Sequence, residues 1–310
     1  MSRIWRISIW LSLIVGLAAT SAAAEEPPNR IVFLAGKASH GYGTHEYYAG
    51  FKYLADILNE NVEDVEATVR KGWPKDMSSL RKADAVVIGS DAGRLITQNL
   101  DEFKELVRRG TGIGCFHYTL VVPKGKYGDS MLDAIGGYYE TYWSVNPIWA
   151  ADFKKLPEHP IGRGVKPFQI RDEWYYHMRF QKNLEGVTPI LTAVPPDRTR
   201  KGPKGPHSGN PHVRARMGKP EHVAWAYERP GGGRGFGFTG MHWHWSWAHD
   251  DYRTTVLNAL VWISGAKVPR KGVPSETPTL QDLQKYLGQD PPENWSPERA
   301  KGMIRGFKSD

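Results

Sequence analysis

The sequence predicts an α/β fold built on a doubly wound, mostly parallel sheet, and three observations support it. Short apolar runs of strand length alternate with segments of helical period through the first half of the chain. Glycine-rich or polar turns follow several of these runs, and the second half adds extra strand patterns. Strands that alternate with helices are typical of a parallel sheet covered by helices on both faces.

The first half contains four predicted strands, at residues 31–35, 65–70, 85–88 and 112–116. A helix follows the first strand, because apolar residues recur at helical spacing from Phe51 onward, and Thr44 is its expected N-cap. A second helix is expected over 100–109, where Asn99 and Glu102 have the spacing of a capping box.

The second half is richer in strands, expected at residues 169–180, 188–194, 221–227 and 235–240. A closing helix is predicted over 251–264 and ends at Gly265. We therefore expect one domain over 30–266. It is followed by a C-terminal tail, 267–310, with one short helix over 280–287 packed on the outside.

The first 24 residues have the pattern of a signal peptide. Arg3 and Arg6 precede an apolar run over 7–19, and three alanines precede Glu25. The run is short for a membrane span, although a retained N-terminal anchor is the alternative. We therefore expect a periplasmic or secreted protein with no stable membrane span after cleavage, joined to its domain by a linker over 25–29.

The positive charge of the chain is concentrated in one loop. The formal net charge is +8, and the Pro- and Gly-rich loop 195–220 carries seven Lys and Arg residues against one Asp. Nucleic-acid-binding proteins spread their basic residues over a groove or a helix face, so the pattern excludes that class. We interpret the loop as a solvated insertion into the domain, with binding of an anionic glycan or lipid as the alternative.

Histidines and acids follow several of the predicted strands. They are His40 and His45 after the first strand, Asp91 after the third, His117 after the fourth, Glu173 within 169–180, and His242 and His244 after the last. In open parallel sheets, ligands bind beyond the carboxyl ends of the strands. A single histidine at a strand end is usually structural, but several at one rim of a sheet indicate a site.

Four of these residues are the candidate catalytic group: His45, His117, Glu173 and His242. The histidines suit acid–base chemistry, or a three-nitrogen divalent metal site with an open position for water. No compact metal motif such as HExxH is present. Glu173 would be a second acid–base or an orienting carboxylate. The lone Cys115 has apolar neighbours, which favours a buried structural residue over a nucleophile, and it excludes a disulfide framework.

The aromatic content favours a sugar as the ligand. The chain contains 12 Trp, and the apolar face of a pyranose ring packs well on Trp and Tyr. The candidate substrate-binding residues are His40, Asp91, Trp174, Tyr175, Trp243 and His244. The alternative is that the tryptophans fill the core, since Trp243, Trp245 and Trp247 have the period of one packed strand face.

Several short motifs together resemble the ThuA-like family, named for trehalose utilisation. They are Ser39-His40-Gly41-Tyr42-Gly43-Thr44-His45-Glu46, Gly112-Ile113-Gly114-Cys115-Phe116-His117, His159-Pro160-Ile161, Asp172-Glu173-Trp174-Tyr175 and the segment from 235 to 265. The resemblance implies a flavodoxin-like fold of the class I glutamine amidotransferase-like superfamily. It also implies a role in carbohydrate metabolism, which includes keto-sugars, and it does not imply amidotransferase activity.

We therefore expect an exported carbohydrate enzyme, a hydrolase, lyase or isomerase, that acts on a glycoside or keto-glycoside. Two alternatives stay open: a carbohydrate-binding protein without catalysis, and a metal-dependent hydrolase of another substrate class. The expected partner is a small carbohydrate, and the sequence leaves self-association into a homo-oligomer open. The signal peptide, the basic loop and the tail distinguish this chain from shorter family members and favour a periplasmic role.

Overall fold

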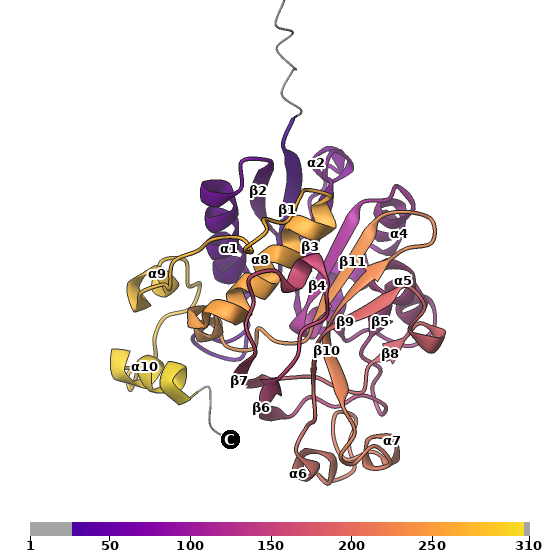
Figure 1. Cartoon of the computed structure of the whole chain (residues 1–310), viewed down its shortest axis with the longest axis vertical. Coiled ribbons are helices and arrows are strands. Elements are labelled where there is room, and N and C mark those ends of the chain that lie inside the picture. Colours follow the sequence, from indigo (N-terminus) through magenta and orange to yellow (C-terminus); the bar gives the residue numbers. More distant parts are fainter. Residues whose placement is uncertain (1–26, 307–310) are drawn as a thin grey trace, which may run out of the picture.

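The computed structural model describes residues 27–306. Its central sheet has seven strands in the order β2-β1-β3-β4-β11-β10-β9 (Figure 1). These strands are β1 Asn29–Ala35, β2 Val65–Lys71, β3 Ala85–Gly89, β4 Gly112–Phe116, β9 Val187–Ala193, β10 Glu221–Glu228 and β11 Arg234–Phe238. The first five strands in the order pair in parallel, and β10 pairs antiparallel with both β11 and β9. The predicted α/β fold with a mostly parallel sheet is confirmed.

Helices cover both faces of this sheet. On one face lie α1 Tyr47–Asn61 and α8 Asp250–Ser264, and on the other lie α4 Leu100–Arg108 and α5 Lys126–Ile135. Every residue of β3 and β4 is buried, as expected for central strands covered on both sides. Neighbouring residues of a strand point to opposite faces, so Phe33 joins the core under α1 and Leu34 joins the core under α4. The helix α5 was not predicted.

Shorter elements connect and extend these layers. They are α2 Ser78–Arg81, α3 Arg94–Gln98, β5 Gly137–Tyr138, β6 Ile148–Phe153, β7 Phe168–Glu173 and β8 Arg179–Phe180. The single strand predicted over 169–180 is wrong, because β7 pairs with β6 and β8 pairs with β5 in two separate small sheets. Between them the chain bends, and His177 has a φ of +58°, which no strand accommodates.

Neither of the two predicted helix caps forms its side-chain hydrogen bond. The first helix begins at Tyr47, and the Thr44 hydroxyl donates to the carbonyls of Ser39 and Gly41 inside the preceding turn. Asn99 does occupy the N-cap position of α4, but its amide donates to the carbonyl of Leu95 in the preceding helix α3, so the expected capping box does not form. Such local hydrogen bonds compete with capping for the same short polar side chains.

The basic loop is partly structured and is not wholly solvated. It contains the short helices α6 Asp197–Arg200 and α7 Pro211–Arg214. The side chain of Arg200 is fully buried, with Nη1 3.0 Å from Oε1 of Glu221 at the start of β10. A buried guanidinium requires such a partner, and the sequence pattern gave no sign of it.

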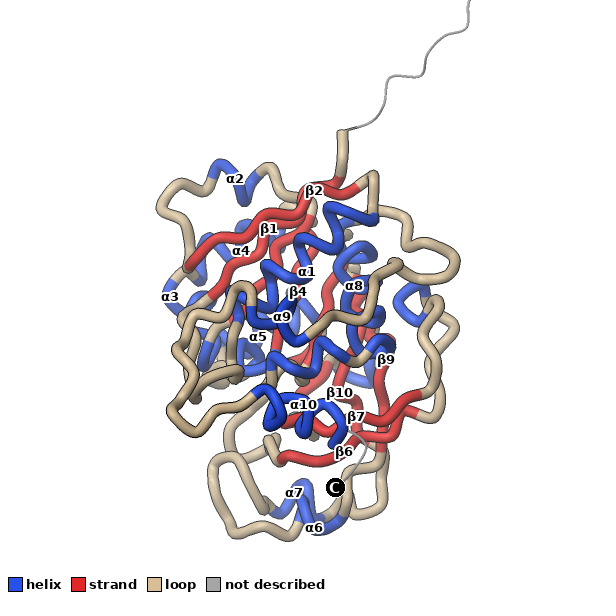
Figure 2. The backbone as a smooth tube through the Cα atoms, turned by 90° about the vertical axis from the view of Figure 1, so that its left-hand side faces the viewer, coloured by secondary structure: helices blue, strands red, loops and turns tan. Residues whose placement is uncertain are grey.

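The C-terminal tail packs on the domain with two helices, α9 Leu280–Gln284 and α10 Pro297–Arg305, where one was predicted. Figure 2 shows both on the side of the molecule that carries α1 and α8. Leu283 and Ala300 are buried there. Within residues 27–306, no helix has both the length and the apolar character that a membrane span needs. The predicted signal peptide, 1–24, lies outside the described residues.

Candidate functional site

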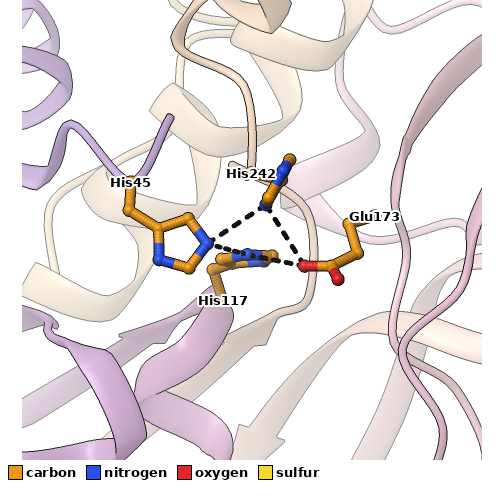
Figure 3. Close-up of side chains that lie close together, drawn as sticks. All are labelled: His45, His117, Glu173 and His242. Atoms are coloured by element: carbon orange, nitrogen blue, oxygen red, sulfur yellow. Dashed lines mark hydrogen bonds and ion pairs between the residues drawn. The ribbon is translucent and has the colours of Figure 1, made fainter. Parts of the chain in front are cut away.

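Four side chains from four separate segments meet at one end of the sheet (Figure 3). His45 lies in the turn between β1 and α1, and His117 directly follows β4. Glu173 is the last residue of β7, and His242 follows β11. The strand ends bring these residues together as expected for this sheet type. The structure therefore joins all four residues of the predicted catalytic group.

The ring nitrogens and the carboxylate form a compact cluster. Nε2 of His45 lies 3.1 Å from Nε2 of His117 and 3.1 Å from Nδ1 of His242. Oε2 of Glu173 lies 3.3 Å from Nε2 of His117 and 3.2 Å from Nδ1 of His242. All four ligand atoms lie within 4.8 Å of one another.

The outer nitrogens of two rings act as hydrogen-bond donors. Nδ1 of His45 lies 2.8 Å from Oδ1 of Asp91, and Nδ1 of His117 lies 2.8 Å from the carbonyl oxygen of Thr239. The carbonyl only accepts, and so does the carboxylate when ionised, so each Nδ1 carries the hydrogen of its ring. A neutral imidazole has only one N–H, so His45, and His117 when its ring is neutral, present a lone pair at Nε2.

Two lone pairs that face each other at 3.1 Å repel, unless a proton or a metal ion lies between them. Burial lowers the pKa of His45 to about 4, against the opposing effect of Asp91, so this ring is neutral at pH 7. Burial alone would raise the pKa of Asp91, but hydrogen bonds from His45, Ser39 and Tyr47 lower it to about 2. The His45–Asp91 pair is therefore a neutral donor beside an ionised acceptor.

The donor set fits a divalent cation. Zinc binds histidine nitrogen at about 2.0–2.1 Å, which in a tetrahedral site places the ligand atoms roughly 3.4 Å apart. Histidines that bind metals usually donate their other N–H to a carboxylate or a backbone carbonyl, as His45 and His117 do. Burial alone would raise the pKa of Glu173, but His117 and His242, when a proton on the facing nitrogen lets them donate to it, lower it below the usual range, so its carboxylate is ionised.

The backbone holds two of these histidines in an uncommon conformation. His45 has a φ of +46° and His117 a φ of +52°, in the left-handed region that few residues other than glycine adopt. At His117 the chain changes from β4 directly into a 3-10 helix, His117–Leu120. Strained residues of this kind persist only where the surrounding structure enforces them, and they cluster at functional sites.

A buried carboxylate positions His242. The side chain of Asp172 is fully buried and accepts hydrogen bonds from the backbone N–H groups of Met241 and His242, at 3.1 and 3.2 Å. It also accepts from the hydroxyls of Ser246 and Tyr252. Asp172 precedes Glu173 in β7, so the end of this strand supplies the carboxylate of the cluster and also anchors the loop that carries His242.

The comparisons with known proteins agree with one another. The model of the ThuA family, described as trehalose utilisation, matches residues 30–263, about three quarters of the chain. The chain belongs to the ThuA family. No curated protein matches it.

Two solved structures support the fold. A putative ThuA-like protein from Bacteroides uniformis is similar with a TM-score of 0.54 and 15% identity, covering 78% of this chain and 94% of that one. A putative ThuA-like protein from Parabacteroides merdae has a TM-score of 0.51 and 15% identity, covering 83% and 99%. The family is associated with carbohydrate utilisation.

Four of the predicted substrate-binding residues of this ThuA chain lie beside the cluster. Asp91 contacts His45, and the His40 ring lies 4.0 Å from the His45 ring between centroids. The Tyr175 hydroxyl lies 3.2 Å from Nε2 of His117. Trp243 is half-buried, and its ring lies 5.3 Å from that of His242.

Two predicted binding residues are not in the site. Trp174 is fully buried against Phe153 and Phe238, because it follows Glu173 directly and points to the opposite side of the strand end. His244 lies in the 3-10 helix His244–Ala248, and its Nε2 contacts the carbonyl of Leu283 in the tail at 2.7 Å. The expected alternation of a strand over 243–247 is therefore wrong.

The structure adds residues that the sequence analysis did not select. A cavity of 90 Å³ at the cluster is also lined by Tyr118, Asn146 and His207. His207 comes from the basic loop, where neither periodicity nor a strand end marked it. Cys115 is fully buried at the end of β4, and burial raises the pKa of its thiol, which agrees with the expected structural role.

Proposed function

We propose that this ThuA-family protein is a carbohydrate enzyme that uses a divalent metal ion held by His45, His117, His242 and Glu173. The observation that carries the proposal is the pair of Nε2 atoms that face each other at 3.1 Å, each on a ring whose Nδ1 is already a donor. A metal ion removes the conflict between their lone pairs. The substrate that the family points to is a glycoside or keto-glycoside.

A metal ion at this position would polarise a sugar oxygen or lower the pKa of a bound water. The protein supplies the remaining groups. His40 and His207 line the 90 Å³ cavity beside the cluster and are able to exchange a proton with a bound sugar. Asn146 Nδ2 donates to Oε1 of Glu173 at 3.2 Å and so orients the carboxylate.

We further propose that the protein acts outside the cytoplasm. The support is the basic, apolar and small-residue pattern of residues 1–24, which is typical of export signals. Expression of the full chain and N-terminal sequencing of the exported protein test this point, since cleavage after residue 24 is expected.

The enzymatic proposal is tested with the purified protein, a panel of glycosides and keto-glycosides, and a chelator. We expect turnover of at least one compound, loss of turnover with the chelator, and recovery on adding Zn²⁺ or Mn²⁺. His117→Ala removes turnover and lowers the metal content.

His159→Ala is the matched control. His159 is a half-buried histidine that accepts a hydrogen bond from the Ile161 N–H, away from the cluster. Sugar binding without any product would favour a binding protein. Turnover that is unaffected by metal removal would contradict the metal-dependent mechanism.

A further inference from the structure

The cavity at the histidine cluster is too small for a whole sugar. Its 90 Å³ is far below the about 300–1,000 Å³ of ordinary small-molecule sites. A second cavity of 1020 Å³ lies next to it, and the two share His40 and Tyr118 in their walls. A ligand whose reacting end reaches the cluster must therefore place most of its atoms in the larger cavity.

The larger cavity lies where this type of sheet binds ligands. Gly36, Gly72 and Ser90 line it, and they directly follow β1, β2 and β3. The order β2-β1-β3 shows that the chain reverses its winding direction between β1 and β3, where the crevice of an open α/β sheet forms. Tyr48 and Tyr118 provide ring surfaces in its wall, and such surfaces suit the apolar faces of a sugar.

The C-terminal tail forms part of this wall through Gly288 and Gln289. Nε2 of Gln289 donates to the carbonyl of Gly41 at 2.8 Å and to Oε1 of Glu46 at 3.2 Å. The Gly288 N–H donates to Oε2 of Glu46 at 3.1 Å, and Glu46 is only 3% exposed. The tail is thus fixed to the turn that carries His40 and His45.

One polar atom in this wall is left for a ligand. The three contacts of the Gln289 amide all use Nε2, and within residues 27–306 its Oε1 has no hydrogen-bond partner. Gln289 is only partly buried and lines the cavity, so this oxygen is available to a sugar hydroxyl. The family model ends at residue 263, so the tail that supplies this atom lies beyond the matched region.

We propose that the 1020 Å³ cavity is the subsite for the non-reacting part of the carbohydrate and that the tail completes it. Gln289 accepts a hydrogen bond from a hydroxyl of the second sugar unit and so favours disaccharides over simple glycosides. The proposal rests on the proposed function, because it assumes that the reacting sugar unit is held at the histidine cluster.

The test compares Gln289→Ala with Gln284→Ala in the full chain. Gln284 belongs to the same tail segment and donates from Nε2 to the Tyr42 hydroxyl at 3.1 Å, but it does not line the cavity. Dissociation constants are measured by calorimetry for trehalose, its ring-oxidised keto derivative and methyl α-glucoside. The metal affinity of each variant is measured separately.

For Gln289→Ala we expect roughly three- to tenfold weaker binding of the disaccharide, as one neutral hydrogen bond is worth. The dissociation constant of methyl α-glucoside and the metal affinity stay unchanged in Gln289→Ala. Gln284→Ala changes the dissociation constant of neither sugar. Equal losses for both ligands, or for both variants, would overturn the role of Gln289. A wild-type protein that binds its metal but none of these sugars would overturn the subsite alone, whereas failure to bind metal would contradict the proposed function.

Discussion

Replacing Asp91 by Asn tests whether the surroundings of the cluster are built for a metal. Oδ1 of Asp91 lies 2.8 Å from Nδ1 of His45 and accepts a hydrogen bond of 2.8 Å from the Tyr47 hydroxyl. The neutral amide keeps the size of the side chain but removes the negative charge that holds the His45 hydrogen on Nδ1. Without that charge, the hydrogen of the His45 ring is no longer held on Nδ1 and can occupy Nε2, the atom that faces His117 and His242.

The size of the effect follows from the chemistry of such contacts. Loss of an outer partner of a metal-binding histidine usually costs about 10- to 100-fold in metal affinity. This corresponds to roughly 1.4–2.7 kcal/mol of binding free energy. We expect the Zn²⁺ affinity of Asp91→Asn, measured by competition with a fluorescent chelator, to fall within this range.

Glu66→Gln on β2 serves as the control, because Glu66 is an exposed carboxylate whose ion pair with Arg30 lies far from the cluster in the fold. Surface ion pairs of this kind contribute little to the free energy of folding, so the metal affinity and thermal midpoint of Glu66→Gln should match those of the wild type. If Asp91→Asn unfolds at the wild-type temperature and binds Zn²⁺ with wild-type affinity, the reasoning about the enforced lone pair is wrong.

Three further predictions concern the framework. Asp172→Ala leaves five donors without their acceptor, so we expect a loss of several kcal/mol in the free energy of unfolding, measured by urea denaturation; a loss below about 1 kcal/mol would contradict this role. Arg200→Met removes the buried partner of Glu221, but Arg216 and His177 stay within 3.2 and 3.7 Å of Oε1, so the loss should be smaller than the roughly 3–5 kcal/mol of a pair broken without compensation, and the double variant with Glu221→Gln should recover part of it; additive losses would refute the coupling. Truncation after Lys267 should leave a folded domain with a lower thermal midpoint, because Leu283 and Ala300 no longer cover the core; a truncated chain without a cooperative unfolding transition would show that the tail is required for folding.

Much of the site could be predicted from the sequence because strand ends fix positions. His117 directly follows the buried strand β4, so its place at the rim depends on no long loop. His45 and Asp91 follow β1 and β3 within short turns, and the parallel sheet brings these ends to the same edge. For these residues, the local strand pattern and the topology of the parallel sheet are together enough to predict the position at the rim.

The rest depended on contacts between segments that are distant in the sequence. Glu173 reaches the cluster because β7 pairs with β6 in a separate small sheet whose end lies at the rim, and Trp174, the next residue, points to the opposite side into the core. His244 has the two-residue spacing from His242 expected of a shared strand face, but a 3-10 helix replaces the strand. His207 lies in the basic loop 195–220, where the Asn146 N–H contacts its carbonyl and the Tyr139 hydroxyl contacts Nδ1 of its ring.

The most direct test of the metal site is anomalous diffraction from crystals of the protein grown with Zn²⁺ or Mn²⁺. We predict one strong peak per chain, bound by Nε2 of His45, Nε2 of His117, Nδ1 of His242 and a carboxylate oxygen of Glu173. Metal–nitrogen distances near 2.0–2.1 Å are expected for zinc. Crystals that show no peak at these four side chains in the presence of excess metal, with Nε2 of His45 still 3.1 Å from Nε2 of His117, would contradict the account.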